Sequence, residues 1–154
     1  MTHQATTART RVLGPGLVLG AGLGGFVDGI VLHQILQWHH LLSARTSDIE
    51  ANTLADGLFH AASWVFVAAG LFWLWRRVGR GAVDWRWSAL ISPLLAGWGL
   101  FNLVEGLVNH HLLGLHHVRA GPHRTAYDVG FLLFGGLLVG LGAALHRRSA
   151  IGQR

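Results

Sequence analysis

Four long apolar runs constrain this 154-residue chain more than any other feature. A helix that crosses a bilayer needs about 20 mostly apolar residues, and the runs cover residues 12–42, 54–75, 88–113 and 126–145. Only 12% of the residues are charged, against roughly 25% in soluble domains. The sequence therefore predicts an all-α integral membrane protein, a bundle of four transmembrane helices.

The polar segments between the runs are too short to form a second domain. We expect one transmembrane domain over residues 12–146, with short cytoplasmic tails at 1–11 and 147–154. With both ends of the chain inside the cell, nine arginines lie on the cytoplasmic side and three on the other. Because cytoplasmic loops carry the excess of positive charge, this count predicts an N-in, C-in protein of the cell membrane.

The net positive charge of the chain does not indicate nucleic acid as a partner. The formal net charge is +5, and all twelve cations are arginines. These arginines flank the apolar runs, whereas a nucleic-acid surface gathers them on one face. We therefore expect the lipid bilayer as a partner and no nucleic acid.

The two halves of the sequence resemble each other. His39-His40-Leu41-Leu42 matches His110-His111-Leu112-Leu113, Asp56 matches Asp128, and Arg76-Arg77 matches Arg147-Arg148, all at offsets of 71 or 72 positions. Both hairpins would enter the membrane from the same side, as in parallel repeats. This pattern predicts two duplicated helical hairpins related by a pseudo-twofold axis, with a site between them.

Histidine and carboxylate side chains are the main potential metal ligands in this sequence. The chain has eleven His, seven Asp plus Glu and no Cys, and its one Met is Met1. Disulfides, iron–sulfur clusters and thiolate metal ligands are therefore excluded. Imidazole and carboxylate ligands without sulfur favour a divalent transition metal, with Cu, Zn and Fe as the candidates.

Placing an ionisable residue inside a membrane costs free energy, so each such residue is a candidate functional residue. At about 1.5 Å per helical residue, His33, His60 and Glu105 all lie roughly 9–13 Å below the outer helix ends. Three different spans thus bring two imidazoles and a carboxylate to a similar depth, with further histidines above them. The predicted metal ligands are His33, His40, Asp56, His60, Glu105, His111, His116 and His117.

A second group of polar residues is predicted to orient these ligands. Asn109 follows Glu105 by one helical turn, a spacing that lets an amide support a ligand. His39 and His110 point away from their neighbours His40 and His111, and an interfacial role for them stays open. The predicted supporting residues are Asp28, Gln37, His39, Asn102, Asn109, His110 and Asp128.

Long segments of the chain resemble a known family of bacterial and archaeal membrane proteins. The segments are Phe26–His40, Asp56–His60, Gly97–Gly106 and His110–Arg119, and the family is domain-of-unknown-function family 2243. The resemblance implies a four-span protein of a bacterial or archaeal cell membrane and brings no established activity. Asn109 stands where the family pattern is expected to have Asp.

These observations favour a membrane metalloprotein with one ion or two at the outer end of the bundle. Such a site would support redox chemistry, or activate water or oxygen. Two alternatives stay open: a protein that handles copper, zinc or haem for the assembly of respiratory enzymes, and a b-type haem protein, which the carboxylate among the ligands disfavours. The sequence does not decide whether the protein is an enzyme, or whether it has a homo-oligomeric or respiratory-chain partner.

Overall fold

The computed structural model describes residues 2–80, 83 and 86–151. In this part of the chain the elements are all helical. In chain order they are α1 (Thr2–Val27), the π-helix η1 (Asp28–Ile35), α2 (Ile49–Val78), α3 (Trp87–Glu105), the π-helix η2 (Gly106–Leu112) and α4 (Arg124–Ile151).

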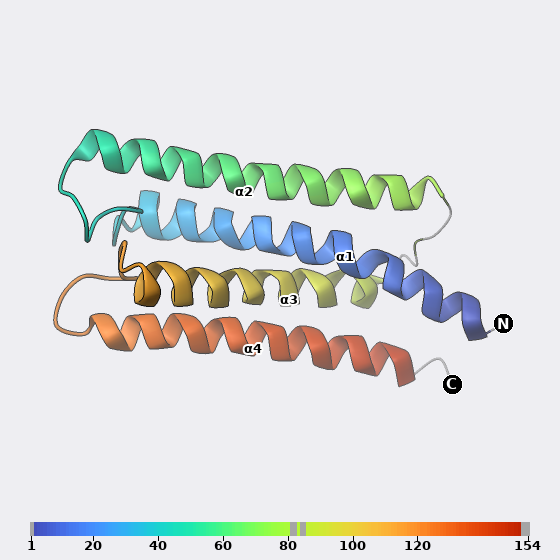
Figure 1. Cartoon of the computed structure of the whole chain (residues 1–154). Coiled ribbons are helices and arrows are strands. Elements are labelled where there is room, and N and C mark those ends of the chain that lie inside the picture. The colour runs from blue at the N-terminus through green and yellow to red at the C-terminus, as the bar shows by residue number, and fades with distance from the viewer. Residues whose placement is uncertain (1, 81–82, 84–85, 152–154) are drawn as a thin grey trace.

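The four long helices lie side by side in the order α2, α1, α3, α4, with both termini at one end of the bundle (Figure 1). Four helical segments are long and apolar enough to cross a membrane: Val12–Ile35, Ile49–Val78, Trp87–Leu112 and Arg124–Arg148. The segment that contains α1 is 50% buried in its most apolar window, and α2 only 11%. The central pair α1 and α3 therefore forms the interior, and the predicted four-helix membrane fold is confirmed.

Glycines let the two central helices approach closely. A Cβ atom on Gly20 would lie 2.2 Å from the carbonyl oxygen of Leu94, and one on Gly97 would lie 2.1 Å from that of Leu17. Small residues allow such backbone contact in membranes, where packing replaces the hydrophobic drive between helices. Gly20 and Gly97 therefore set the distance between α1 and α3.

These contacts repeat between the two halves at an offset of 77 positions. Gly20 faces Leu94 as Gly97 faces Leu17, and the same shift relates the two π-helices. The predicted register, which paired His39-His40 with His110-His111, is therefore not the one that the contacts follow. That string lies in η2 in the second half but beyond η1 in the first. The duplication itself stays a prediction.

The first membrane helix ends earlier than the predicted span of 12–42. The α-helical pattern gives way at Asp28 to η1, whose last residue is Ile35. Gln37 then adopts φ 49°, a left-handed conformation that ends a helix for a non-glycine residue. Residues 36–48 consequently form a loop that turns back over the bundle end.

We predict that Gly97→Ala destabilises the bundle by about 1–3 kcal/mol, because the added methyl group must push apart two backbones in contact. Heating the detergent-solubilised protein and measuring the folded fraction by size-exclusion chromatography checks this. Gly136→Ala is the matched control, since no atom lies within 4 Å of a Cβ built there. Equal thermal stability of the two variants would contradict the assigned contact.

Candidate metal centre

Two π-helices shape the bundle end at which the histidines gather. Leu36 N–H donates to the carbonyl of Val31 at 2.8 Å, and Leu113 N–H donates to that of Val108 at 2.7 Å. In a π-helix, residues five apart lie about one turn apart. Asp28 and His33 thus share a face, although an α-helix would turn them well away from each other. Glu105 and His110 have the same spacing at the start of η2.

Asp56 of α2 holds the first half of this end together. Its Oδ1 lies 2.9 Å from Nδ1 of His33 and accepts a 2.8 Å hydrogen bond from the backbone N–H of Leu41. Its Oδ2 lies 2.7 Å from Nδ1 of His40. One buried carboxylate therefore fixes the end of η1 and the loop that follows.

Asp128 of α4 does the same for the second half. Its Oδ2 lies 2.6 Å from Nδ1 of His117, and its Oδ1 accepts a 2.9 Å hydrogen bond from the N–H of Val118. Nδ1 of His110 lies 3.3 Å from the same Oδ1. Each partner of Asp128 stands 77 positions after a partner of Asp56.

The two loops also exchange hydrogen bonds across the middle of the bundle. Nδ1 of His39 donates to the carbonyl of Val118 at 2.8 Å, and Nδ1 of His116 donates to the carbonyl of Leu41 at 3.0 Å. A carbonyl can only accept, so both imidazoles carry their proton on Nδ1. In the neutral rings Nε2 then keeps a free lone pair, which is the state that binds a metal ion.

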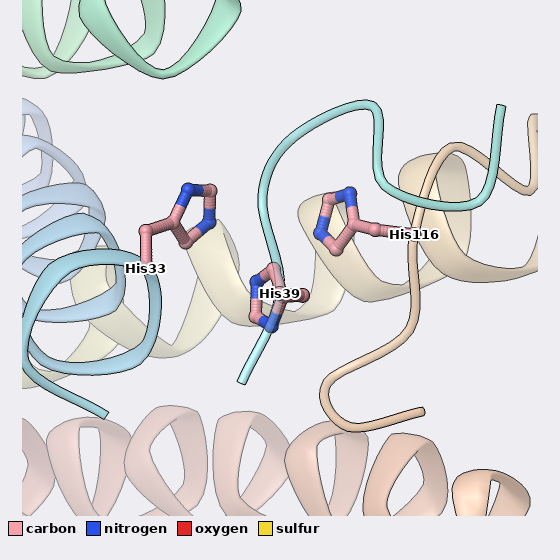
Figure 2. A group of neighbouring side chains, drawn as sticks. All are labelled: His33, His39 and His116. Carbon is pink, nitrogen blue, oxygen red and sulfur yellow. The ribbon is translucent and has the colours of Figure 1, made fainter. Parts of the chain in front are cut away.

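Imidazoles and a carboxylate from both halves converge at one point. The ligand atoms of His33, His39 and His116 lie within 4.8 Å of one another, and so do those of Glu105, His110 and His116. Figure 2 shows the three rings of the first group gathered together from η1 and two loops. Nε2 of His116 lies 2.9 Å from Oε1 of Glu105, and Nε2 of His110 lies 3.1 Å from Oε2.

Asp28 completes the arrangement, with Oδ2 at 3.3 Å from Nε2 of His33. We call the six residues that converge here the central cluster: Asp28, His33, His39, Glu105, His110 and His116. None of them is more than 5% exposed. Among the described residues, these atoms of the cluster have no hydrogen-bond partner: Asp28 Oδ2, His33 Nε2, His39 Nε2, Glu105 Oε2 and His110 Nδ1.

Unpartnered buried polar atoms normally cost free energy, and the contacts with imidazole nitrogens offset part of that cost for Asp28 Oδ2 and Glu105 Oε2. Burial, together with the neighbouring rings of His116 and His33, lowers the pKa of His39 to about 3. His39 is therefore neutral at ordinary pH. A cation at the centre would pair with its lone pair and with the carboxylates of Asp28 and Glu105.

Comparison with known proteins places this architecture in a family. The family described as predicted membrane protein (DUF2243) matches residues 15–149. The chain belongs to the DUF2243 family. No curated protein and no solved structure matches it significantly.

The structure of this DUF2243 protein brings several predicted residues together. Of the predicted metal ligands, His33, Glu105 and His116 lie in the central cluster. Asp56, His40 and His117 lie directly around it, in the hydrogen bonds described above. Of the predicted supporting residues, Asp128 holds histidines, and Asn109 donates to Oε1 of Glu105 at 3.4 Å.

Three other predicted supporting residues, Asp28, His39 and His110, belong to the central cluster itself. His39 and His110 are 5% and 3% exposed, so their side chains lie inside this end of the bundle and not on its surface. The spacing Asp28, His33, His39-His40 recurs as Glu105, His110, His116-His117. This common spacing is the sequence signal that would have identified all six residues.

The remaining predicted residues lie outside the cluster. Nδ1 of His60 donates to the carbonyl of Asp56 at 2.6 Å. Nδ1 of His111 lies 2.9 Å from the carbonyl of Gly106 on an exposed part of η2. Gln37 is exposed, and Asn102 is buried with its Oδ1 unpartnered.

We predict that Asp56→Asn loosens residues 36–48. An amide offers one acceptor atom, whereas the carboxylate accepts from two imidazoles and a backbone N–H, and each lost bond to a charged group costs about 1.5–3 kcal/mol. Faster amide hydrogen exchange across residues 36–48 would show the effect.

Asp48→Asn is the matched control, because Asn caps a helix as well as Asp does. Asp48 is exposed, and its Oδ1 caps α2 by accepting from the N–H of Glu50. Unchanged exchange in Asp56→Asn would contradict the role assigned to this carboxylate.

Proposed function

We propose that this protein is an integral membrane metalloprotein whose central cluster binds two divalent transition-metal ions. The observation that carries the proposal is the convergence of four imidazoles and two carboxylates, each 5% exposed or less, with Nε2 of His33 and His39, Oδ2 of Asp28 and Oε2 of Glu105 lacking a hydrogen-bond partner among the described residues. In the proposed assignment, Asp28, His33 and His39 hold one ion. Glu105, His110 and His116 hold the other.

The negative charge of the buried carboxylates supports a site with two metal ions and not one. Four carboxylates, Asp28, Asp56, Glu105 and Asp128, are each 5% exposed or less. Within the described part of the chain, their ion pairs are with imidazoles. Burying uncompensated negative charge is strongly unfavourable. Two divalent cations would balance four carboxylates while leaving the imidazoles neutral.

The hydrogen bonds around the cluster support a resident metal as well. Metal-bound imidazoles typically donate their other N–H to a carboxylate or a carbonyl, which fixes the tautomer and the ring. His33 has such a partner in Asp56, and His39 and His116 have carbonyl partners. Because the donors are N and O atoms without sulfur, Cu, Zn and Fe remain the candidate metals.

Three protein ligands to each ion leave coordination positions open, as catalytic metal sites do. Such ions can activate water or oxygen or take part in electron transfer. The deep burial of all six ligands favours a resident ion over the passing cargo of a transport or delivery protein. Haem is disfavoured because the rings of His39 and His116 stack with centroids 4.5 Å apart, leaving no space for a porphyrin between them.

The arginine count supports an orientation in which the central cluster lies at the outer end of the bundle. In the structure, the start of α1 and the ends of α2 and α4 lie at the opposite end (Figure 1). We infer that the protein is N-in, C-in in the cell membrane, which would give metal ions access from outside the cell.

Metal analysis of the purified protein tests the proposal. We expect about two ions of Cu, Zn or Fe per chain, measured by mass spectrometry after purification with a tag that contains no histidine. Glu105→Gln and His116→Ala should each lose at least one ion, since each removes a proposed ligand. Size-exclusion chromatography of the same samples shows that the variants are folded.

Two histidine variants serve as controls in the metal analysis. His123→Ala removes an exposed histidine, and His60→Ala removes one whose Nδ1 is held by a backbone carbonyl. Both should keep the metal content of the wild type. Absence of stoichiometric metal in wild-type protein supplied with all three metals would overturn the proposal, and so would an equal loss in the control variants.

A further inference from the structure

A cavity of about 360 Å³ reaches the central cluster from the side of the bundle. Its walls come from α1, α3 and α4 and include Asp28, Asn102 and Tyr127 among apolar side chains. Val27 and Val31 at its edge are 40% and 36% exposed, and Phe134 is 44% exposed. Because these residues lie in membrane-spanning segments, the cavity opens toward lipid.

The inner wall of this cavity carries two buried acceptors, and the one on Asp28 lies 3.3 Å from Nε2 of His33. Asp28 Oδ2 and Asn102 Oδ1 make no hydrogen bond with the described residues. Asp28 is 5% exposed and Asn102 is 2% exposed. A molecule that fills the cavity would therefore bind best if it donates hydrogen bonds at its inner end.

A second cavity of about 440 Å³ continues from the first along the same face of the bundle. Val27, Val31 and Trp98 line both cavities. The lining of the second is entirely apolar and includes Leu23, Ile30, Ile91, Leu94 and Leu95. The two cavities together match a molecule that has a hydroxyl-bearing ring at one end and a hydrocarbon tail at the other.

Aromatic side chains favour a flat ring in the first cavity. Trp98, Phe131 and Phe134 line it, and aromatic rings pack well against one another at offset or edge-on angles. Tyr127 lies at its outer part, where its hydroxyl accepts a 3.0 Å hydrogen bond from Arg119. At the inner end of the cavity a ligand carboxylate is disfavoured, because Asp28 would repel it.

We propose that these cavities bind an isoprenoid quinol from the bilayer, with a ring hydroxyl donating to Asp28. The inference rests on the proposed function, since Asp28 is also a proposed ligand of the metal centre. It predicts preference for the reduced form: a quinol donates two hydrogen bonds, while a quinone can only accept and leaves Asp28 and Asn102 unpartnered.

Binding of decylubiquinol and decylubiquinone to the protein in nanodiscs tests this. Quenching of tryptophan fluorescence reports the binding, because Trp98 lines both cavities. We expect saturable binding of the quinol at least about tenfold tighter than that of the quinone. No saturable binding of the quinol, or equal binding of both forms, overturns the proposal.

Two glycine variants of α4 locate the ligand. Gly130 lines the first cavity, and no atom lies within 4 Å of a Cβ built there, so Gly130→Leu fills the cavity without a clash at Cβ. We expect it to weaken quinol binding at least about tenfold. Gly136→Leu, on the same helix outside the lining and equally free of neighbours, should bind like the wild type. Equal binding by the two variants overturns the proposed location.

The metal content of the same samples separates this inference from the proposed function. Gly130→Leu should keep both ions, since residue 130 supplies no proposed ligand and no atom lies within 4 Å of a Cβ built there. Wild-type protein that binds metal but no quinol would overturn the cavity proposal alone. Protein that binds quinol at Gly130 but holds no metal would support the cavity and overturn the metal centre.

Discussion

Two buried carboxylates, Asp56 and Asp128, hold the histidine-rich end of this bundle in place. Each joins its own helix to a π-helix and to the loop that follows, through two imidazoles and a backbone N–H. Without these carboxylates, the two loops would lose the hydrogen bonds that hold them turned inward over the bundle end. The inward turn is what positions His39 and His116, whose Nδ1 atoms then bind the carbonyls of the opposite half. The central cluster is thus a consequence of a hydrogen-bond scaffold built around it.

The hydrogen bonds around the central cluster meet a strict requirement of the membrane interior. Polar groups away from water need partners, and the scaffold gives each Nδ1 of His33, His39 and His116 one acceptor. Nε2 of His33 and His39, Oδ2 of Asp28 and Oε2 of Glu105 have no hydrogen-bond partner among the described residues, although the two carboxylates lie 3.1–3.3 Å from imidazole nitrogens. A pair of cations is the simplest partner that would satisfy all of them at once. Asp28 also lines the lateral cavity. The same carboxylate therefore faces both the central cluster and a cavity that opens toward lipid.

The fold could be predicted from the sequence because it depends on hydrophobic length, which is a local property. The site could be predicted only in part. Depth predicts His33 and Glu105, along with His60, which lies outside the cluster, and His116 is predicted among the histidines above them. His39 is predicted on a continuous helix, whereas η1 ends at Ile35 and Gln37 follows with a positive φ. The pairing of Asp28 with His33 depends on π-helical winding, which hydropathy does not encode. The predicted repeat pairs Asp56 with Asp128, whose contacts correspond, but it pairs His39-His40 with His110-His111, because the string His-His-Leu-Leu is more conspicuous than the widely spaced residues that recur after 77 positions.

Anomalous X-ray diffraction from crystals of the metal-loaded protein tests the central claim most directly. At the absorption edge of the bound metal, we expect two peaks about 3.5–4 Å apart, the usual spacing of two-metal sites. One peak should lie about 2.0–2.2 Å from Nε2 of His33 and His39, and the other at the same distance from Nε2 of His110 and His116. No peak within the central cluster, or peaks only at His60, His111 or His123, would contradict the account.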